Sequence, residues 1–197
     1  MNVSSRWCVT ALFALGALAC SDPVPPPAQG AFIASVGPAP ITPPMRACPT
    51  SAFTYDVPQV RDMALAEVLD ADNYTHKIIN GQSGASVGCS VKGGGSAFTF
   101  SGEISQNGRA LSITGGTLGA DRKGTATITI TNQQRLSPAQ LVSPPGACAI
   151  DAAAAAGNTF EVAAGRIWAH FKCSSVELMP ANYCGAEGYF VLENCEQ

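Results

Sequence analysis

The chain has 197 residues, of which only 13% are charged, and its formal net charge at pH 7 is −3. Typical soluble proteins carry roughly 25% charged residues, so uncharged polar side chains and glycine must cover much of this surface. The sequence contains no cluster of lysine or arginine. This argues against a nucleic-acid partner, and it leaves no basic helix to hold a membrane surface.

Near the N-terminus, an apolar run at residues 7–20 follows Arg6. The run is shorter than the roughly 20 residues that an α-helix needs to cross a bilayer. A short apolar run after a positive N-terminus, ending in small residues, is typical of a secretory signal peptide. We therefore expect residues 1–19 to be removed. The alternatives are cleavage at a nearby position and an uncleaved anchor.

The end of this run, Ala17-Leu18-Ala19-Cys20, resembles the lipobox of bacterial lipoproteins, although that family more often has leucine where Ala17 stands. In that class the peptide is cut before the cysteine, which then carries the lipid, including palmitate. The resemblance implies lipid attachment at Cys20. It also implies an exported protein anchored at the outer membrane or cell surface rather than the inner membrane.

Residues 20–47 are rich in proline, which removes backbone donors and favours the polyproline II conformation. We predict a semi-rigid tether, which at ~3.1 Å per residue would reach on the order of 80 Å. Within it, residues 31–36 are apolar enough to dock as an edge strand instead. We place the folded domain at residues 48–197.

The cysteine count favours a disulfide-tied domain. Of the eight cysteines, Cys8 leaves with the signal peptide and Cys20 would carry lipid. An even number in an oxidising compartment predicts three disulfides. The six cysteines concerned are Cys48, Cys89, Cys148, Cys173, Cys184 and Cys195. Their wide spacing, without a CxxC pair, makes a zinc site improbable. The sequence alone does not choose among the pairings that six cysteines allow; our weak preference is Cys89 with Cys148, and Cys173 with Cys184 or Cys195.

Only one segment of the domain favours helix. Residues 61–69 contain good helix formers, with Asp62 as a candidate N-cap. They predict at most one short helix, which must pack on something larger to be stable.

Residues 85–132 instead alternate with a period of two, which predicts strands. The Asn107-Gly108 pair is a strong hairpin signal, and Gly115-Gly116 predicts a bulge. We therefore expect an antiparallel meander. Its predicted core residues are Val87, Cys89, Val91, Phe98, Phe100, Ile104, Leu111, Ile113, Ala126, Ile128 and Ile130.

After the meander, residues 133–158 predict a long loop held by Cys148, because prolines and Gly157 interrupt them. Strands follow around residues 160–162 and 165–173, then a turn at Cys184-Gly185 and a closing strand at 189–192. The pattern predicts an all-β fold, an antiparallel β-sandwich first and a small β-barrel second. This layout resembles exported β-sandwich lipoproteins of myxobacteria and mycobacteria. That class supplies no catalytic residues.

Three motifs suggest chemistry but have simpler explanations. Residues 84–88 match GxSxG around Ser86, yet they open a strand where a hydrolase requires a helix, and His170 is the only histidine downstream. The second histidine, His76, has no spacing that indicates a metal site. Asp70, Asp72 and Asn73 offer alternating oxygen ligands, but without the later residues of a calcium loop. We expect no catalytic residues, no metal and no cofactor.

The most interesting predicted surface is the outer face of the strand at residues 165–173. It carries Arg166, Trp168, His170 and Lys172. An exposed indole ring beside cations can stack on a sugar or hold an anionic partner; the alternative is a face covered by another segment. We expect a non-enzymatic, lipid-anchored envelope protein with a binding or structural role and a glycan or protein partner. The alternatives are a carbohydrate-binding module centred on Trp168 and a secreted hydrolase that uses carboxylates such as Asp70 and Asp72.

Overall fold

The computed structural model describes residues 24–38, 46–48, 53–57, 77–133, 139–153, 160–179 and 182–197. Within these ranges the chain forms strands and turns and contains no helix. The segment predicted to be helical, residues 61–69, lies outside them. The prediction of an all-β, disulfide-tied fold is confirmed.

Four long strands form one layer in chain order. They are β5 (Ser86–Gly94), β6 (Ala97–Gln106), β7 (Arg109–Leu118) and β8 (Lys123–Asn132). Each pairs antiparallel with the next, so the predicted meander is confirmed. Asn107 and Gly108 have φ values of 52° and 74°, which matches the hairpin turn. Between Thr114 and Thr117 the β7–β8 register shifts, at the predicted glycine bulge.

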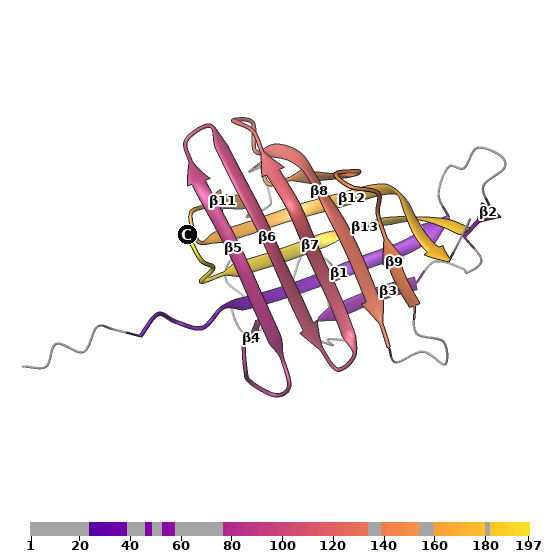
Figure 1. Ribbon diagram of the computed structural model, residues 1–197, viewed down its shortest axis with the longest axis horizontal. Coiled ribbons are helices and arrows are strands. Elements are labelled where there is room, and N and C mark those ends of the chain that lie inside the picture. The colour runs from indigo at the N-terminus through magenta and orange to yellow at the C-terminus, as the bar shows by residue number, and fades with distance from the viewer. Residues whose placement is uncertain are drawn as a thin grey trace, which may run out of the picture.

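The other layer contains the longest strands. β12 (Arg166–Met179) pairs with β13 (Asn182–Glu193), which pairs with β1 (Gln29–Pro38), and β1 pairs with β3 (Phe53–Val57). Figure 1 shows β5–β8 crossing in front of β12, β13 and β1 at a steep angle, as in a sandwich of two layers.

Short strands complete the sheet. β10 (Cys148–Asp151) and β9 (Ala139–Val142) each pair with both β8 and β12, so the two layers are parts of one folded sheet. The others are β2 (Arg46–Ala47), β4 (Ile78–Ile79) and β11 (Glu161–Ala163). β4 pairs with β1 and β11 with β12, both antiparallel, whereas β2 pairs parallel with β13.

The core fills the space between the layers. Its largest fully buried side chains are Phe32, Phe171, Phe190, Ile104, Leu111, Ile113, Ile128, Ile130, Leu141, Ile150 and Ile167. They come from both layers and from β9 and β10. Burial of this apolar surface is the main stabilising contribution to the fold.

The N-terminal tether prediction is wrong for residues 29–38. These residues form β1, which pairs with β13 along its whole length and with β3 on its other side. Ala31, Phe32 and Ala34 are fully buried, because residues 31–36 form an interior strand rather than an edge. The folded domain therefore includes β1, and its boundary at residue 48 must be corrected.

Two other boundaries are corrected. The predicted loop at residues 133–158 contains β9 and β10, because Leu141 and Ile150 join the core. The predicted turn at Cys184-Gly185 lies inside β13, where both residues pair with β1. A strand of twelve residues thus replaces the short closing strand expected at 189–192.

All six predicted cysteines form disulfides, but the predicted pairing is wrong. Cys48 bonds Cys184, Cys89 bonds Cys195, and Cys148 bonds Cys173. The last pair is directly opposed across β10 and β12, with Cα atoms 4.1 Å apart. By contrast, Cys89–Cys195 joins β5 to the segment after β13, although these two strands are far apart in the order of the sheet. Sequence spacing does not reveal which cysteines come together.

Candidate functional site

The four residues of the predicted ligand surface lie on the outer face of β12, as their alternation indicated. Arg166 and Lys172 are exposed and His170 is half-buried. Trp168 is only 4% exposed. The indole ring is therefore not open, and of the two alternatives the covered face holds at Trp168.

Neighbours from β1 and β13, and from the segments that precede β4 and β11, enclose Trp168. The indole belongs to a small apolar cluster with Ala31, Val191, Phe160 and Tyr189. Its Nε1 donates a hydrogen bond of 2.9 Å to Oε1 of Glu193. The ammonium of Lys77 lies 5.3 Å from the ring centre and pairs with the same carboxylate. Trp168 thus holds this face together and presents no stacking surface.

Farther along the same face from Trp168, acidic and basic side chains of neighbouring strands lie opposite one another. Glu187 contacts His170 at 3.1 Å and Lys172 at 3.0 Å. The hydrogen bond from Lys172, followed by that from His170, lowers the pKa of Glu187 although partial burial opposes this. These charges are paired within the protein, which leaves no concentrated field for an anionic partner.

The next pair along the same face is Asp151 with Lys123, at 2.9 Å. Burial acts to raise the pKa of Asp151, but hydrogen bonds from Lys123 and from the Ala153 amide outweigh it and lower the pKa. The same hydrogen bond raises the pKa of Lys123.

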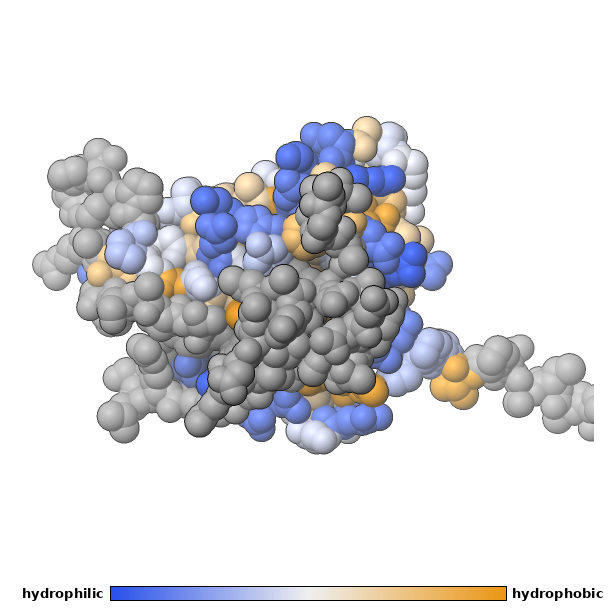
Figure 2. Space-filling view, turned by 180° about the vertical axis from the view of Figure 1, so that it is seen from behind, coloured by the Kyte–Doolittle hydropathy of each residue, from blue (hydrophilic) through white to orange (hydrophobic). Residues whose placement is uncertain are grey.

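Apolar side chains offer no docking surface on the described residues. The large apolar side chains that are exposed are Val24 and Val142, at 89% and 39%. In Figure 2, which shows the back of the molecule, the orange areas of the described surface are small and separate. Contiguous apolar patches mark many protein and membrane interfaces, and the described surface carries none of that kind.

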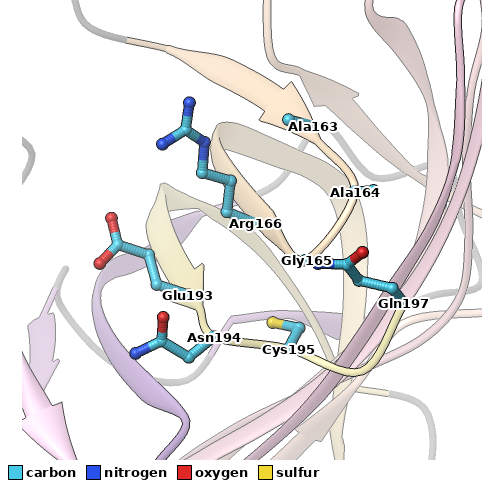
Figure 3. Close-up of a pocket in the computed structure, with 8 residues that line it drawn as sticks. All are labelled: Ala163, Ala164, Gly165, Arg166, Glu193, Asn194, Cys195 and Gln197. Carbon is cyan, nitrogen blue, oxygen red and sulfur yellow. The ribbon is translucent and has the colours of Figure 1, made fainter. Parts of the chain in front are cut away.

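A pocket of about 450 Å³ lies at one end of the sandwich, where the β11–β12 turn meets the end of β13. Its lining residues are Ala163, Ala164, Gly165, Arg166, Glu193, Asn194, Cys195 and Gln197. Figure 3 shows Arg166, Glu193 and Asn194 on one side of it and Gln197 on the other, with Gly165 and Cys195 between them. Among the four residues of the predicted ligand surface on β12, only Arg166 lines this pocket.

The floor of the pocket is fixed by hydrogen bonds and a disulfide. Gly165 has a φ of 81°, which suits glycine in a tight turn. Its amide donates to the Val91 carbonyl at 3.0 Å, and its carbonyl accepts from the Cys195 amide at 2.9 Å. The Cys89–Cys195 disulfide ties the same segment to β5. The pocket is therefore built on covalently restrained backbone.

A second hollow of about 300 Å³ opens on the other layer, at the Gly115-Gly116 bulge. Hydroxyl side chains surround it: Ser90, Thr99, Ser101 and Thr117. It belongs to the outer face of β5–β8, where the threonines of β8 also lie.

The remaining predicted residues do not assemble into a site. Ser86 lies at the start of β5 in one layer and His170 on the outer face of the other, so they cannot form a nucleophile and base pair. Asp70, Asp72, Asn73, His76 and Cys20 lie outside the described residues. Among the described residues, no three histidine, cysteine or acidic side chains gather as metal ligands.

One partial signal for the pocket is present in the sequence. The cysteine count predicts a disulfide at Cys195, but no motif surrounds Asn194 or Gln197. Their approach to the β11–β12 turn depends on the Cys89–Cys195 bond, whose pairing the spacing did not predict.

The fold and its bonds define the protein as an all-β sandwich tied by three disulfides. Comparisons with protein-family models, with curated proteins and with solved structures find no match. No helix in the described ranges is long and apolar enough to cross a membrane.

Proposed function

We propose that the protein is a non-enzymatic, lipid-anchored binding protein of the bacterial cell envelope, with the lipid on Cys20. The observation that carries this proposal is the use of the cysteines. The six cysteines beyond residue 20 bond one another in three pairs. Cys20 is thereby left over in the mature chain, at the position where the lipobox resemblance requires a modified cysteine. Three disulfides also suit an exported protein.

The position of β1 determines how far the anchored domain could lie from the membrane. Because β1 begins at Gln29, only residues 21–28 separate the lipid from the fold. At ~3.1 Å per residue this linker spans on the order of 25 Å. The domain would therefore stay close to the membrane surface, unlike a domain on the longer tether that the sequence suggested.

Labelling with palmitate in a bacterium that processes lipoproteins tests the anchor. We expect label in the wild type and in Cys8→Ala, whose substitution lies in the removed peptide. Cys20→Ala should lose the label. The intact mass of the membrane-extracted wild type should correspond to a chain that begins at Cys20 and carries acyl chains. A mature mass without lipid, or label retained by Cys20→Ala, would refute the proposal.

A further inference from the structure

The pocket at the β11–β12 turn has the size of a small-molecule site. Its volume of about 450 Å³ falls within the roughly 300–1,000 Å³ of ligand pockets. Such pockets are mostly apolar, whereas this one is lined by a guanidinium, a carboxylate and two amides. Its ligand must therefore be small and strongly polar.

The charges of the pocket are balanced inside the protein. The Arg166 Nε contacts Oε1 of Glu161 at 2.9 Å, and Glu193 is paired with Lys77. An anionic ligand would meet two carboxylates near Arg166, and a cationic ligand would meet the guanidinium. A neutral ligand avoids both penalties, because it breaks no existing ion pair.

The polar groups of the lining suit hydroxyls. A hydroxyl both donates and accepts hydrogen bonds, and the side-chain amides of Asn194 and Gln197 do the same. The fork of Arg166 adds further donors. Ala163 and Ala164 contribute methyl groups, which can contact the C–H face of a small ring.

Two parts of the lining are held in place before any ligand arrives. Asn194 Nδ2 donates to the Pro27 carbonyl at 3.0 Å, and the Cys89–Cys195 disulfide fixes the opposite side. Gln197 lies close over Gly165, where an added Cβ would come within 2.9 Å of its amide nitrogen. Groups that are already held in place lose less entropy on binding than free ones.

We infer that this pocket binds a neutral saccharide of one or two sugar units. The inference rests on the binding role proposed above, but not on the lipid. The hydrogen bond from Asn194 to Pro27 places the pocket at the end of the sandwich where the chain leaves β1 toward Cys20. An anchored domain would thus hold the pocket near the sugars of the membrane surface.

The test is a titration of the mature protein, kept in a detergent without a sugar headgroup, by saturation-transfer NMR. The probes are glucose, galactose, mannose, N-acetylglucosamine and their common disaccharides, with glucuronate as the charged comparison. We expect at least one neutral sugar to bind, and more tightly than glucuronate. Failure of every neutral sugar to bind, or tighter binding of glucuronate, would overturn the inference.

Variants locate the binding. Ala164→Trp, at the exposed turn, should fill the pocket and abolish the signal. Gln197→Ala should weaken binding up to about tenfold, as expected for one lost hydrogen bond. Lys172→Ala, on the same strand but outside the pocket, is the matched control and should bind as the wild type does. Unchanged binding by both Ala164→Trp and Gln197→Ala would refute the site.

A last comparison distinguishes the source of the sugar. Vesicles that carry the bound sugar as a glycolipid headgroup should bind the protein better than the free sugar if the headgroup is the ligand. Equal binding indicates a free or polymeric glycan. Because palmitate labelling does not depend on this pocket, failure of the saccharide site and failure of the lipid anchor are distinguishable.

Discussion

Trp168 and Glu193 are joined between β12 and β13 by a hydrogen bond of 2.9 Å from the indole nitrogen to the carboxylate. The same carboxylate pairs with Lys77, whose side chain is only 4% exposed. The indole, the carboxylate and the ammonium therefore form one closed unit on the outer face of the sheet. This unit explains why an aromatic ring on the outward side of a strand is buried.

The burial of Trp168 predicts weak quenching of its fluorescence. The chain has two tryptophans, and the other, Trp7, leaves with the predicted signal peptide. The mature protein should therefore emit from Trp168 alone. We expect acrylamide to quench the native emission much less than the emission in denaturant, and sugars to leave it unchanged. Equal quenching in both states would show that the ring is accessible.

Glu193 and Glu161 allow a comparison of a buried and an exposed ion pair. Glu193→Gln keeps an acceptor for Trp168 but removes the charge opposite the buried Lys77. We expect a loss of about 3–5 kcal/mol in the free energy of unfolding. The control, Glu161→Gln, breaks a pair with Arg166 whose side chains are 40% and 51% exposed, and should cost about 0–1 kcal/mol. Denaturant unfolding measures both, and equal losses would contradict the role of burial.

The sequence predicted local structure well and partners poorly. The alternation around Phe98 and Phe100, and the turn at Asn107-Gly108, are properties of adjacent residues, so the meander could be predicted. For β1 the sequence offered only an edge strand at residues 31–36 within a proline-rich linker. Its interior position could not be predicted, because it depends on pairing with β13, far along the chain.

The same reason applies to the candidate sites. The alternation of β12 placed Trp168 on the outer face correctly, but its burial depends on Ala31 and Val191 from other strands. The cysteine count predicted three disulfides, whereas their pairing depends on which strands the fold brings together. Gln197 lies beside Gly165 because the Cys89–Cys195 disulfide ties the end of the chain to β5.

Two glycines, one closely packed and one with open space around it, test the packing of the sheet. A Cβ at Gly188, in β13 between β1 and β12, would come within 2.0 Å of the Ile33 carbonyl oxygen. Gly188→Ala should therefore cost about 1–3 kcal/mol, as overpacking does. At Gly88, in β5, a Cβ meets nothing within 4 Å, so Gly88→Ala should be neutral or stabilise by up to about 1 kcal/mol. Thermal unfolding compares the two, and a tolerated Gly188→Ala would show that β1 and β13 can separate.

Glu187 predicts a small loss of stability in acid. Its pKa is lowered from the ordinary value of 4.5, chiefly by the hydrogen bond from Lys172. The native state therefore binds this proton less readily than the unfolded chain does. The stabilisation is fully present above pH about 4.5 and is lost as the pH falls through the lower native pKa.

Because the Glu187 side chain is 51% exposed, we expect this contribution to stay below about 1 kcal/mol. Glu187→Gln should lower stability at pH 7 but not at pH 2, and Lys172→Gln should reduce the difference between the two pH values. Lys92→Gln, at an exposed lysine of the other layer, is the control. A loss for Glu187→Gln that is the same at both pH values would exclude the charged contacts as its cause.

The disulfides should differ in their contribution because they close loops of different length. Cys148–Cys173 spans 25 residues and Cys89–Cys195 spans 106. Constraint of the unfolded chain predicts stabilisation of about 3.5 kcal/mol for the first and about 5 kcal/mol for the second. Replacing each pair by alanine and measuring unfolding in urea tests this order. The Cys89→Ala/Cys195→Ala variant should also lose saccharide binding while folded, since that bond positions the pocket. The Cys148→Ala/Cys173→Ala variant should keep it. If the shorter loop proves more stabilising, native packing around Cys148, rather than chain constraint, determines the effect.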